Sequence, residues 1–234
     1  MKKSALALAA TTALTIAGLV QPSKVQAGGN DPLTVFAVDI SLSSPFLSKE
    51  GAAGKFADYA RSIIRQLKPG HELQITTLGI PGFETQLNLK ARIGNESRAK
   101  ARVLADGAAQ VIRSIPTRYD AGEFPGQDFT SIVDFFESFG AYDCKTRATH
   151  LVVATDGVEW TPTFNGEAFA SGKLTLPRPA SAFLEGCRVT MVGVGADLTV
   201  ASDRIYLRLQ PQWEAYLKAA GAVEVTIAGT RFGN

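Results

Sequence analysis

Histidine and cysteine are scarce in this 234-residue sequence, which holds two of each. His71 falls in a predicted turn and His150 begins a predicted strand, so neither indicates a metal cluster or a catalytic base, and we interpret both as structural. The sequence also lacks internal repeats, low-complexity tracts and a lysine motif that would bind phosphate. No catalytic apparatus is recognisable, and an enzyme is therefore not expected.

One apolar run, residues 4–20, comes directly after Lys2 and Lys3 and is followed by small residues ending at Ala27. This layout predicts a secretory signal peptide over residues 1–27 and a single domain over residues 28–234. A retained membrane anchor is the alternative, although the run is slightly shorter than the roughly 20 residues of a span. No cysteine follows the run to carry a lipid, so we expect a periplasmic or secreted protein without stable membrane insertion.

An excess of positive charge is absent from the predicted mature chain. Cleavage after Ala27 would remove three lysines and no acid, leaving 21 basic against 22 acidic residues. A nucleic-acid partner is therefore not expected.

Short apolar segments alternate with helical patterns along residues 28–234. The predicted strands cover residues 33–39, 72–78, 87–93, 150–155, 188–194 and 223–228. Helical periodicity marks residues 56–67, 95–115, 130–139 and 212–220, with Val103 expected on the buried stripe of the second helix. The alternation predicts a Rossmann-like α/β fold, an open and mostly parallel sheet of about six strands with helices on both faces.

The connections carry turn and cap residues. Pro81-Gly82 predicts a hairpin-like turn, Asn95 can cap the following helix, and residues 117–129 are expected to form a loop. Thr130 opens the next helix, in which Ser131 and Asp134 have the spacing of a capping box.

Cys144 and Cys187 each stand just before a predicted strand. If those two strands are neighbours, both cysteines lie at the bottom edge of the sheet, within the reach of a disulfide. An exported chain meets an oxidising compartment, in which such a bridge persists. Two free buried thiols are the alternative.

Oxygen-bearing side chains follow two of the predicted strands. Asp39, Ser41 and Ser43 alternate with apolar residues after the first strand, and Asp156 follows the strand over residues 150–155. Both acids come at carboxyl ends of strands, the edge at which open α/β sheets bind ligands. Carboxylates and hydroxyls are hard ligands of the kind that Mg²⁺ prefers. Each residue has a local alternative, because Ser41, Ser43 and Thr130 can cap turns or helices.

The order of these residues resembles the metal-ion-dependent adhesion site of the von Willebrand factor A family. The resemblance covers about residues 31–228 in strand and helix order. It implies that Ser41, Ser43 and Thr130 contact a cation, Mg²⁺ or else Mn²⁺ or Ca²⁺, and that Asp39 and Asp156 act through bound water. It also implies an open coordination position that a Glu or Asp of a partner protein fills.

Aromatic residues surround this edge in the sequence. Trp160 and Phe164 follow Asp156 directly, and Phe124 precedes Thr130. Tryptophan at such a place often anchors a partner, although Trp160 can equally fold back as a lid. Glu159 is a further candidate, because its carboxylate could occupy the cation position from within the chain.

Two other functions compete with cation-dependent binding of a protein. A Mg²⁺-dependent phosphatase of the haloacid dehalogenase type would use Asp39 as nucleophile, but it normally has a second Asp at the position of Ser41. A structural subunit of an envelope or secretion assembly, without a functional metal, would need only the loops and the aromatic surface.

Overall fold

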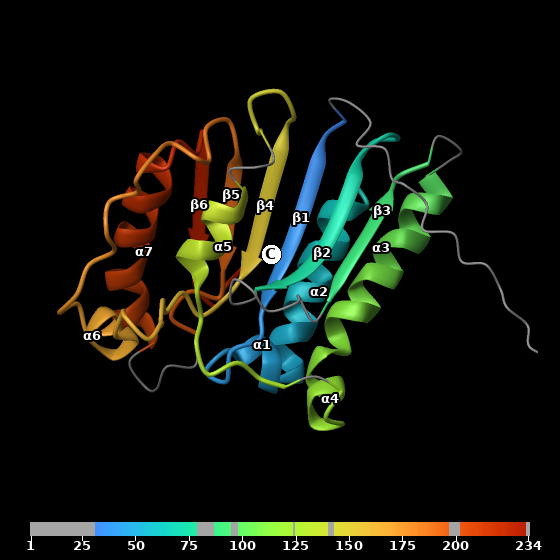
Figure 1. Cartoon of the computed structure of the whole chain (residues 1–234). Coiled ribbons are helices and arrows are strands. Elements are labelled where there is room, and N and C mark those ends of the chain that lie inside the picture. Colours follow the sequence, from blue (N-terminus) through green and yellow to red (C-terminus); the bar gives the residue numbers. More distant parts are fainter. Residues whose placement is uncertain are drawn as a thin grey trace, which may run out of the picture.

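The computed structural model describes residues 31–78, 87–94, 98–123, 125–139, 143–196 and 202–232. Within them, six strands form one sheet in the order β3-β2-β1-β4-β5-β6 (Figure 1). The strands are β1 (Leu33–Asp39), β2 (Glu72–Leu78), β3 (Asn88–Arg92), β4 (Thr149–Ala154), β5 (Arg188–Val192) and β6 (Glu224–Ala228). All neighbours pair in parallel except β2 and β3, which are antiparallel. The predicted fold class is therefore confirmed.

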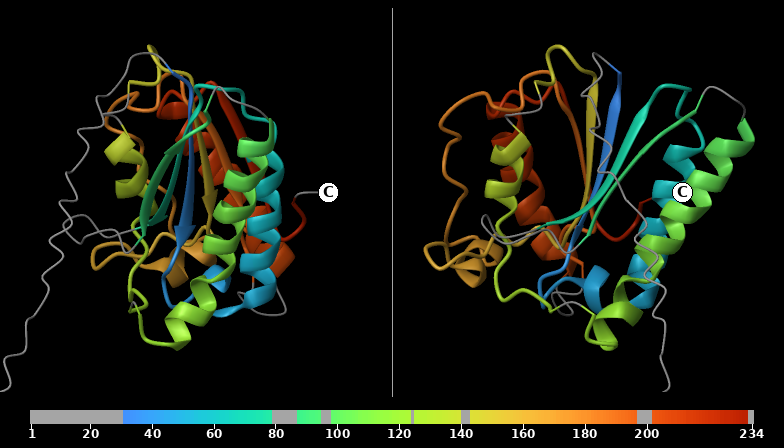
Figure 2. Two further views of the ribbon diagram at one scale, coloured as in Figure 1. Left: turned by 90° about the vertical axis from the view of Figure 1, so that its right-hand side faces the viewer. Right: turned by 45° about the vertical axis from the view of Figure 1, so that its right-hand side comes forward.

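Helices cover both faces of the sheet (Figure 2). One face carries α2 (Glu50–Ile64) and α3 (Arg98–Arg113), and the other carries α5 (Ile132–Ser138) and α7 (Ser202–Ala219). Three short helices lie towards the edge at which β1 and β4 end (Figure 1): α1 (Pro45–Ser48), α4 (Ile115–Asp120) and α6 (Gly166–Ala170).

The core is divided by the sheet into two apolar clusters. Along β1, Val35 and Ala37 pack with α5 and α7, whereas Phe36 and Val38 pack with α2 and α3. All four side chains are fully buried. A strand covered on both faces reads as a continuous apolar run, and this is why Leu33–Asp39 is recognisable in the sequence.

The prediction for the buried stripe of α3 was wrong at Val103, whose side chain is 73% exposed. The buried side of α3 is made mainly of alanines, namely Ala101, Ala105, Ala108 and Ala109, together with Ile112. Small side chains let α3 lie close to α2, and this close packing leaves the larger Val103 outside.

Several helices depart from the predictions. Helix α2 begins at Glu50, six residues before the predicted start, and α1 and α6 were not predicted. The expected loop over residues 117–129 begins with α4, because Pro116 stands in the first turn, where its fixed φ favours a helix start. Helix α7 begins ten residues earlier than expected and runs through Pro211. The carbonyl that this proline leaves without its helical donor belongs to Leu207, which is 68% exposed, so water can satisfy it. The signal peptide, the Pro81-Gly82 turn and the Asn95 cap lie outside the described residues.

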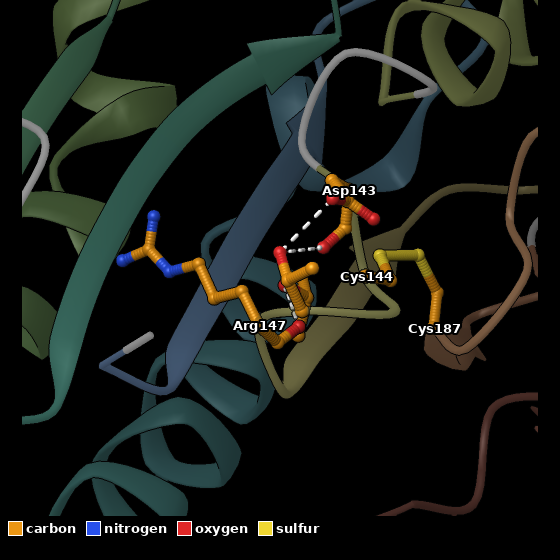
Figure 3. The surroundings of a disulfide bond; sticks show 6 residues. Asp143, Cys144, Arg147 and Cys187 are labelled. Atoms are coloured by element: carbon orange, nitrogen blue, oxygen red, sulfur yellow. Dashed lines mark hydrogen bonds between the residues drawn. A yellow bond between two sulfur atoms is a disulfide. The ribbon is translucent and has the colours of Figure 1, made fainter. Parts of the chain in front are cut away.

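Cys144 and Cys187 form a disulfide, which confirms the predicted bridge (Figure 3). Their Cα atoms are 5.0 Å apart. Because β4 and β5 are neighbours, the two cysteines come together at the amino edge of the sheet, opposite Asp39 and Asp156. Such bridges persist in oxidising compartments, so the disulfide agrees with an extracytoplasmic location.

Candidate metal centre

Three loops meet at the carboxyl edge of the sheet, beside the ends of β1 and β4. The strand order reverses there, because the chain runs from β1 through β2 to β3 on one side and continues with β4 on the other. Such a reversal point is where open α/β sheets bind ligands. The loops carry residues 40–44, 125–131 and 155–161. They contain the candidate ligands Ser41, Ser43, Thr130 and Asp156 and the aromatic residue Trp160.

Backbone hydrogen bonds join these three loops. The Gln127 N–H donates to the Ile40 carbonyl at 3.1 Å, and the Leu42 N–H donates to the Gln127 carbonyl at 2.9 Å. Thr130 and Trp160 exchange two backbone hydrogen bonds, of 2.8 and 3.0 Å. The sequence-predicted ligands Ser41, Thr130 and Asp156 therefore lie in loops that are hydrogen-bonded to one another.

Asp39 is buried at the end of β1 and is held by two donors. Its Oδ1 accepts the Ser41 N–H at 2.8 Å, and its Oδ2 accepts the Thr155 hydroxyl at 2.7 Å. The backbone carbonyl of Asp39 accepts the Ser44 hydroxyl at 2.7 Å. These contacts fix the orientation of the carboxylate.

Asp156 follows β4 and is fully buried, and one of its two carboxylate oxygens has no hydrogen-bond partner among the described residues. Oδ1 accepts the Val158 N–H at 2.8 Å. Oδ2 has no hydrogen-bond partner within the part of the chain that the structure describes. A buried acceptor without a partner costs about 1–3 kcal/mol, and more if it is charged. This unpartnered oxygen is the atom at this edge that most needs a ligand.

Hydroxyl groups surround the two carboxylates. The Ser41 and Ser43 hydroxyl oxygens are 3.3 Å apart, and Ser43 is exposed to solvent, whereas Ser41 and Thr130 are buried. Thr155 was not singled out from the sequence. It stands beside Asp39 because β1 and β4 pair in parallel, with Val38 opposite Ala154.

The two buried acids disfavour each other's ionisation. Burial raises the pKa of Asp156 to about 7 and the charge of Asp39 contributes to the rise, whereas the Val158 N–H and the Ser43 hydroxyl oppose it. Burial also raises the pKa of Asp39, against the stabilising donors of Ser41 and Thr155. Two like charges in a dry site favour either a proton or a cation between them.

These residues fit a hard divalent cation. The set consists of two carboxylates and several hydroxyls, and in the described ranges no three acidic, histidine or cysteine side chains form a group that could hold a metal ion. Mg²⁺ suits such a set, because it keeps several waters and takes few direct protein ligands. The unpartnered Oδ2 of Asp156 would gain a partner, directly or through a cation-bound water.

Glu159 caps helix α5. Its Oε2 accepts the N–H groups of Ile132 and Val133 at 2.7 and 3.0 Å, and the residue is only 3% exposed. The predicted capping box was wrong, because Ser131 makes no side-chain cap hydrogen bond. The same two contacts argue against Glu159 occupying the cation position. Sequence patterns missed this cap because it comes from 26 residues further along the chain.

Glu159 therefore holds the first turn of α5, and with it the loop of Thr130, in place. Glu159→Ala should lower the free energy of unfolding by about 2–3 kcal/mol, because two buried N–H groups lose their acceptor. Glu167→Ala is the matched control, since Glu167 is an exposed acid in the first turn of α6. It should change stability by less than about 0.5 kcal/mol. Equal midpoints for both variants in urea unfolding would show that the cap does not stabilise the fold.

The aromatic residues of the edge differ in exposure. Trp160 is 37% exposed and packs on Gly166, where an added Cβ would lie 2.9 Å from the indole ring. Phe164 is partly buried, and its ring centroid lies 5.4 Å from that of Phe169. Phe124 lies outside the described residues. Trp160 thus packs on its own loop and still exposes part of its side chain to solvent. Phe164 has a packing role that the sequence did not indicate.

A scan of protein-family models and a search of curated proteins found no match to this sequence. Comparison with solved structures found low-identity matches. A von Willebrand factor type A structure from Catenulispora acidiphila has 17% identity and a TM-score of 0.44, covering 87% of this chain and 39% of that one. Human COPII-coat protein Sec24c has 14% identity and a TM-score of 0.44, covering 87% and 30%.

A third match is the PilB minor pilin from Streptococcus sanguinis, with 12% identity and a TM-score of 0.45, covering 88% of this chain and 58% of the pilin. This chain thus spans less than two thirds of the length of each of these proteins. Identities and TM-scores of this size carry no argument about a site or a partner.

Proposed function

We propose that this chain is an exported domain that binds a partner protein through a divalent cation at the carboxyl edge of its sheet. The unpartnered, fully buried Oδ2 of Asp156, next to the buried carboxylate of Asp39, carries the proposal. A cation satisfies both acids at once. Ser41, Ser43 and Thr130 complete the set of oxygen ligands.

A site of this kind would attract an acidic partner. With Asp39 and Asp156 acting through bound water, the groups in direct contact with the cation are uncharged hydroxyls and water, so the cation keeps much of its positive charge. A Glu or Asp side chain of a partner protein would then be drawn to the open coordination position. Mg²⁺ is the first candidate, and Mn²⁺ or Ca²⁺ would serve with the same ligand chemistry.

Two apolar side chains flank the proposed position and would contact the partner. Leu42 stands between Ser41 and Ser43 and is 53% exposed, and Trp160 is 37% exposed. Leu42 lies over Gly126, where an added Cβ would come 2.4 Å from its Cδ2 atom, just as Trp160 lies over Gly166. Because glycine makes room for both, the two side chains are held in place before binding, which lowers the entropy cost of docking.

The proposed location is the periplasm or the cell exterior. The disulfide supports it, as does the predicted signal peptide over residues 1–27. Among the helices that the structure describes, none has the length and apolarity to cross a membrane.

Calorimetric titration of the purified protein with Mg²⁺ and Mn²⁺ tests the cation site. We expect a single site with a Kd on the order of 0.1–1 mM, and Ser41→Ala with Ser43→Ala should weaken it at least tenfold. Ser62→Ala is the control, because Ser62 is an exposed serine of α2 whose hydroxyl bonds only to the Tyr59 carbonyl among described contacts. No binding by the wild type, or equal binding by the double variant, would remove the metal from the proposal.

Affinity capture from envelope extracts tests the partner. Capture should require Mg²⁺, should fail in EDTA, and should be weakened by Trp160→Ser but not by Leu207→Ser, which alters an exposed apolar residue of α7. Capture that persists in EDTA would instead favour a structural subunit whose cation site is not functional.

A further inference from the structure

A cavity of about 390 Å³ lies at the amino edge of the sheet, opposite the candidate metal centre. It sits where the end of α2 and the residues after it face the beginnings of β1, β4 and β5. Ile63 and Leu67 contribute an apolar wall, and Thr34, His150 and Arg188 contribute polar atoms. An apolar wall with a few polar groups is the usual composition of a small-molecule site, and the volume is within the usual range.

Both histidines of the chain line this cavity. The parallel pairing of β1 with β4 places Thr34 opposite His150. His71 reaches the same place from the turn before β2, with its Nε2 3.0 Å from the Thr34 hydroxyl. His150 Nε2 is 2.9 Å from the Thr190 hydroxyl. Within the described residues these are the hydrogen bonds of the two rings, so each ring keeps its Nδ1 for a further partner.

Among the residues that line the cavity, Arg188 carries a charge, and its guanidinium is paired with Glu224. The Arg188 guanidinium contacts Glu224 through Nε at 2.9 Å and through Nη2 at 3.4 Å, and its Nη1 takes no part in either contact. Burial, followed by the charge of Arg188, lowers the pKa of His150 to about 4. Burial, followed by the charge of Arg147, lowers the pKa of His71. Both rings are thus neutral near pH 7, and the charged group that lines the cavity is a guanidinium.

We propose that this cavity binds a small amphiphilic carboxylate. Its apolar body would lie against Ile63 and Leu67, and its carboxylate would accept hydrogen bonds from Arg188 and from the imidazole groups. A guanidinium is the side chain best suited to hold a carboxylate, because it presents paired donors in one plane. The site is separate from the proposed cation site and does not depend on it.

The disulfide joins two walls of this cavity. Cys144 precedes the lining residues Ala148 and Thr149, and Cys187 stands between the lining residues Gly186 and Arg188. Gly186 has φ +89°, and an added Cβ would lie 2.8 Å from the Cys144 carbonyl oxygen, so the two segments are in close contact. The bridge therefore holds the segment that leads into Arg188 against the segment that leads into β4.

NMR titration of the full protein tests the proposal, with 4-phenylbutanoate and hexanoate as probes and 4-phenylbutanamide as the neutral analogue. Since the chain has two histidines, His150→Gln assigns the ring signals of both. We expect both rings to shift with the carboxylates, with a Kd on the order of 1 mM, and the amide to bind at least about tenfold more weakly.

Arg188→Gln should weaken binding of the carboxylates about tenfold. Arg92→Gln is the matched control, because its side chain is 57% exposed, against 54% for Arg188, and is paired with one acid, Asp31. The proposal is overturned if neither carboxylate shifts the histidine rings, if the amide binds as well as the acid, or if the two arginine variants bind equally.

Discussion

Asp156→Asn should stabilise the protein in EDTA and abolish its response to divalent cations. In the metal-free protein, Asp156 is a fully buried acid beside the buried Asp39, and one of its oxygens has no partner in the described part of the molecule. Asn keeps the acceptor for the Val158 N–H and removes the like charge. We expect the free energy of unfolding in EDTA to rise by about 2–4 kcal/mol near pH 7, as measured by urea denaturation.

Cations should narrow this difference in stability. The wild type gains about 2.7 kcal/mol when Mg²⁺ is present at 100 times its Kd, whereas the variant should gain nothing. Asp128→Asn is the control, because Asp128 is an exposed acid on the same edge. It should change stability by less than about 0.5 kcal/mol in either condition. A variant that is destabilised in EDTA, or that still gains stability from Mg²⁺, would contradict the proposed role of Asp156.

The same variant should alter the dependence of stability on pH. A buried carboxyl whose pKa rises from about 3.9 in the unfolded chain to about 7 costs stability once it must ionise. The metal-free wild type should therefore lose stability as the pH rises from about 4 through 7, and Mg²⁺ should suppress that loss. Asp156→Asn should remove part of the slope. The rest comes from Glu159, whose pKa is raised to about 7, first by burial, and from Asp39.

Predicting the sheet from the sequence succeeded because its signals are local. Each buried parallel strand is a short apolar run, and Asp39 and Asp156 mark where two of these runs end. The crossover connections then place both acids at one edge. The positions of the two acids follow from strand ends and topology alone, without knowledge of any side-chain contact.

What the sequence did not predict depends on contacts between distant residues. Glu159 caps α5 from another loop, and His71 joins His150 only because β1 lies between β2 and β4. Val103 was misplaced for a different reason. Helical periodicity marks an apolar stripe, but close packing of α3 on α2 selects the alanine stripe beside it.

Removing the disulfide should have the other large effect. Cys144 and Cys187 are 43 residues apart, and a bridge that closes a loop of this length stabilises a protein by about 4 kcal/mol, chiefly by restricting the unfolded chain. Cys144→Ala with Cys187→Ala should lose about that much in urea unfolding. Wild-type protein treated with a reductant is the control, and it should unfold at a midpoint close to that of the double variant.

The two edges of the sheet should respond differently to this loss. The bridge holds the segments before β4 and β5 at the amino edge, whereas Asp39 and Asp156 are held at the carboxyl edge by Ser41, Thr155 and Val158. Under conditions in which the double variant is still folded, its Mg²⁺ affinity should match that of the wild type. Its binding of 4-phenylbutanoate should fall, because the segment that leads into Arg188 is no longer held against the segment that leads into β4. A loss of Mg²⁺ affinity instead would mean that the two edges are coupled through the sheet, and an unchanged midpoint in urea would mean that the bridge does not constrain the chain.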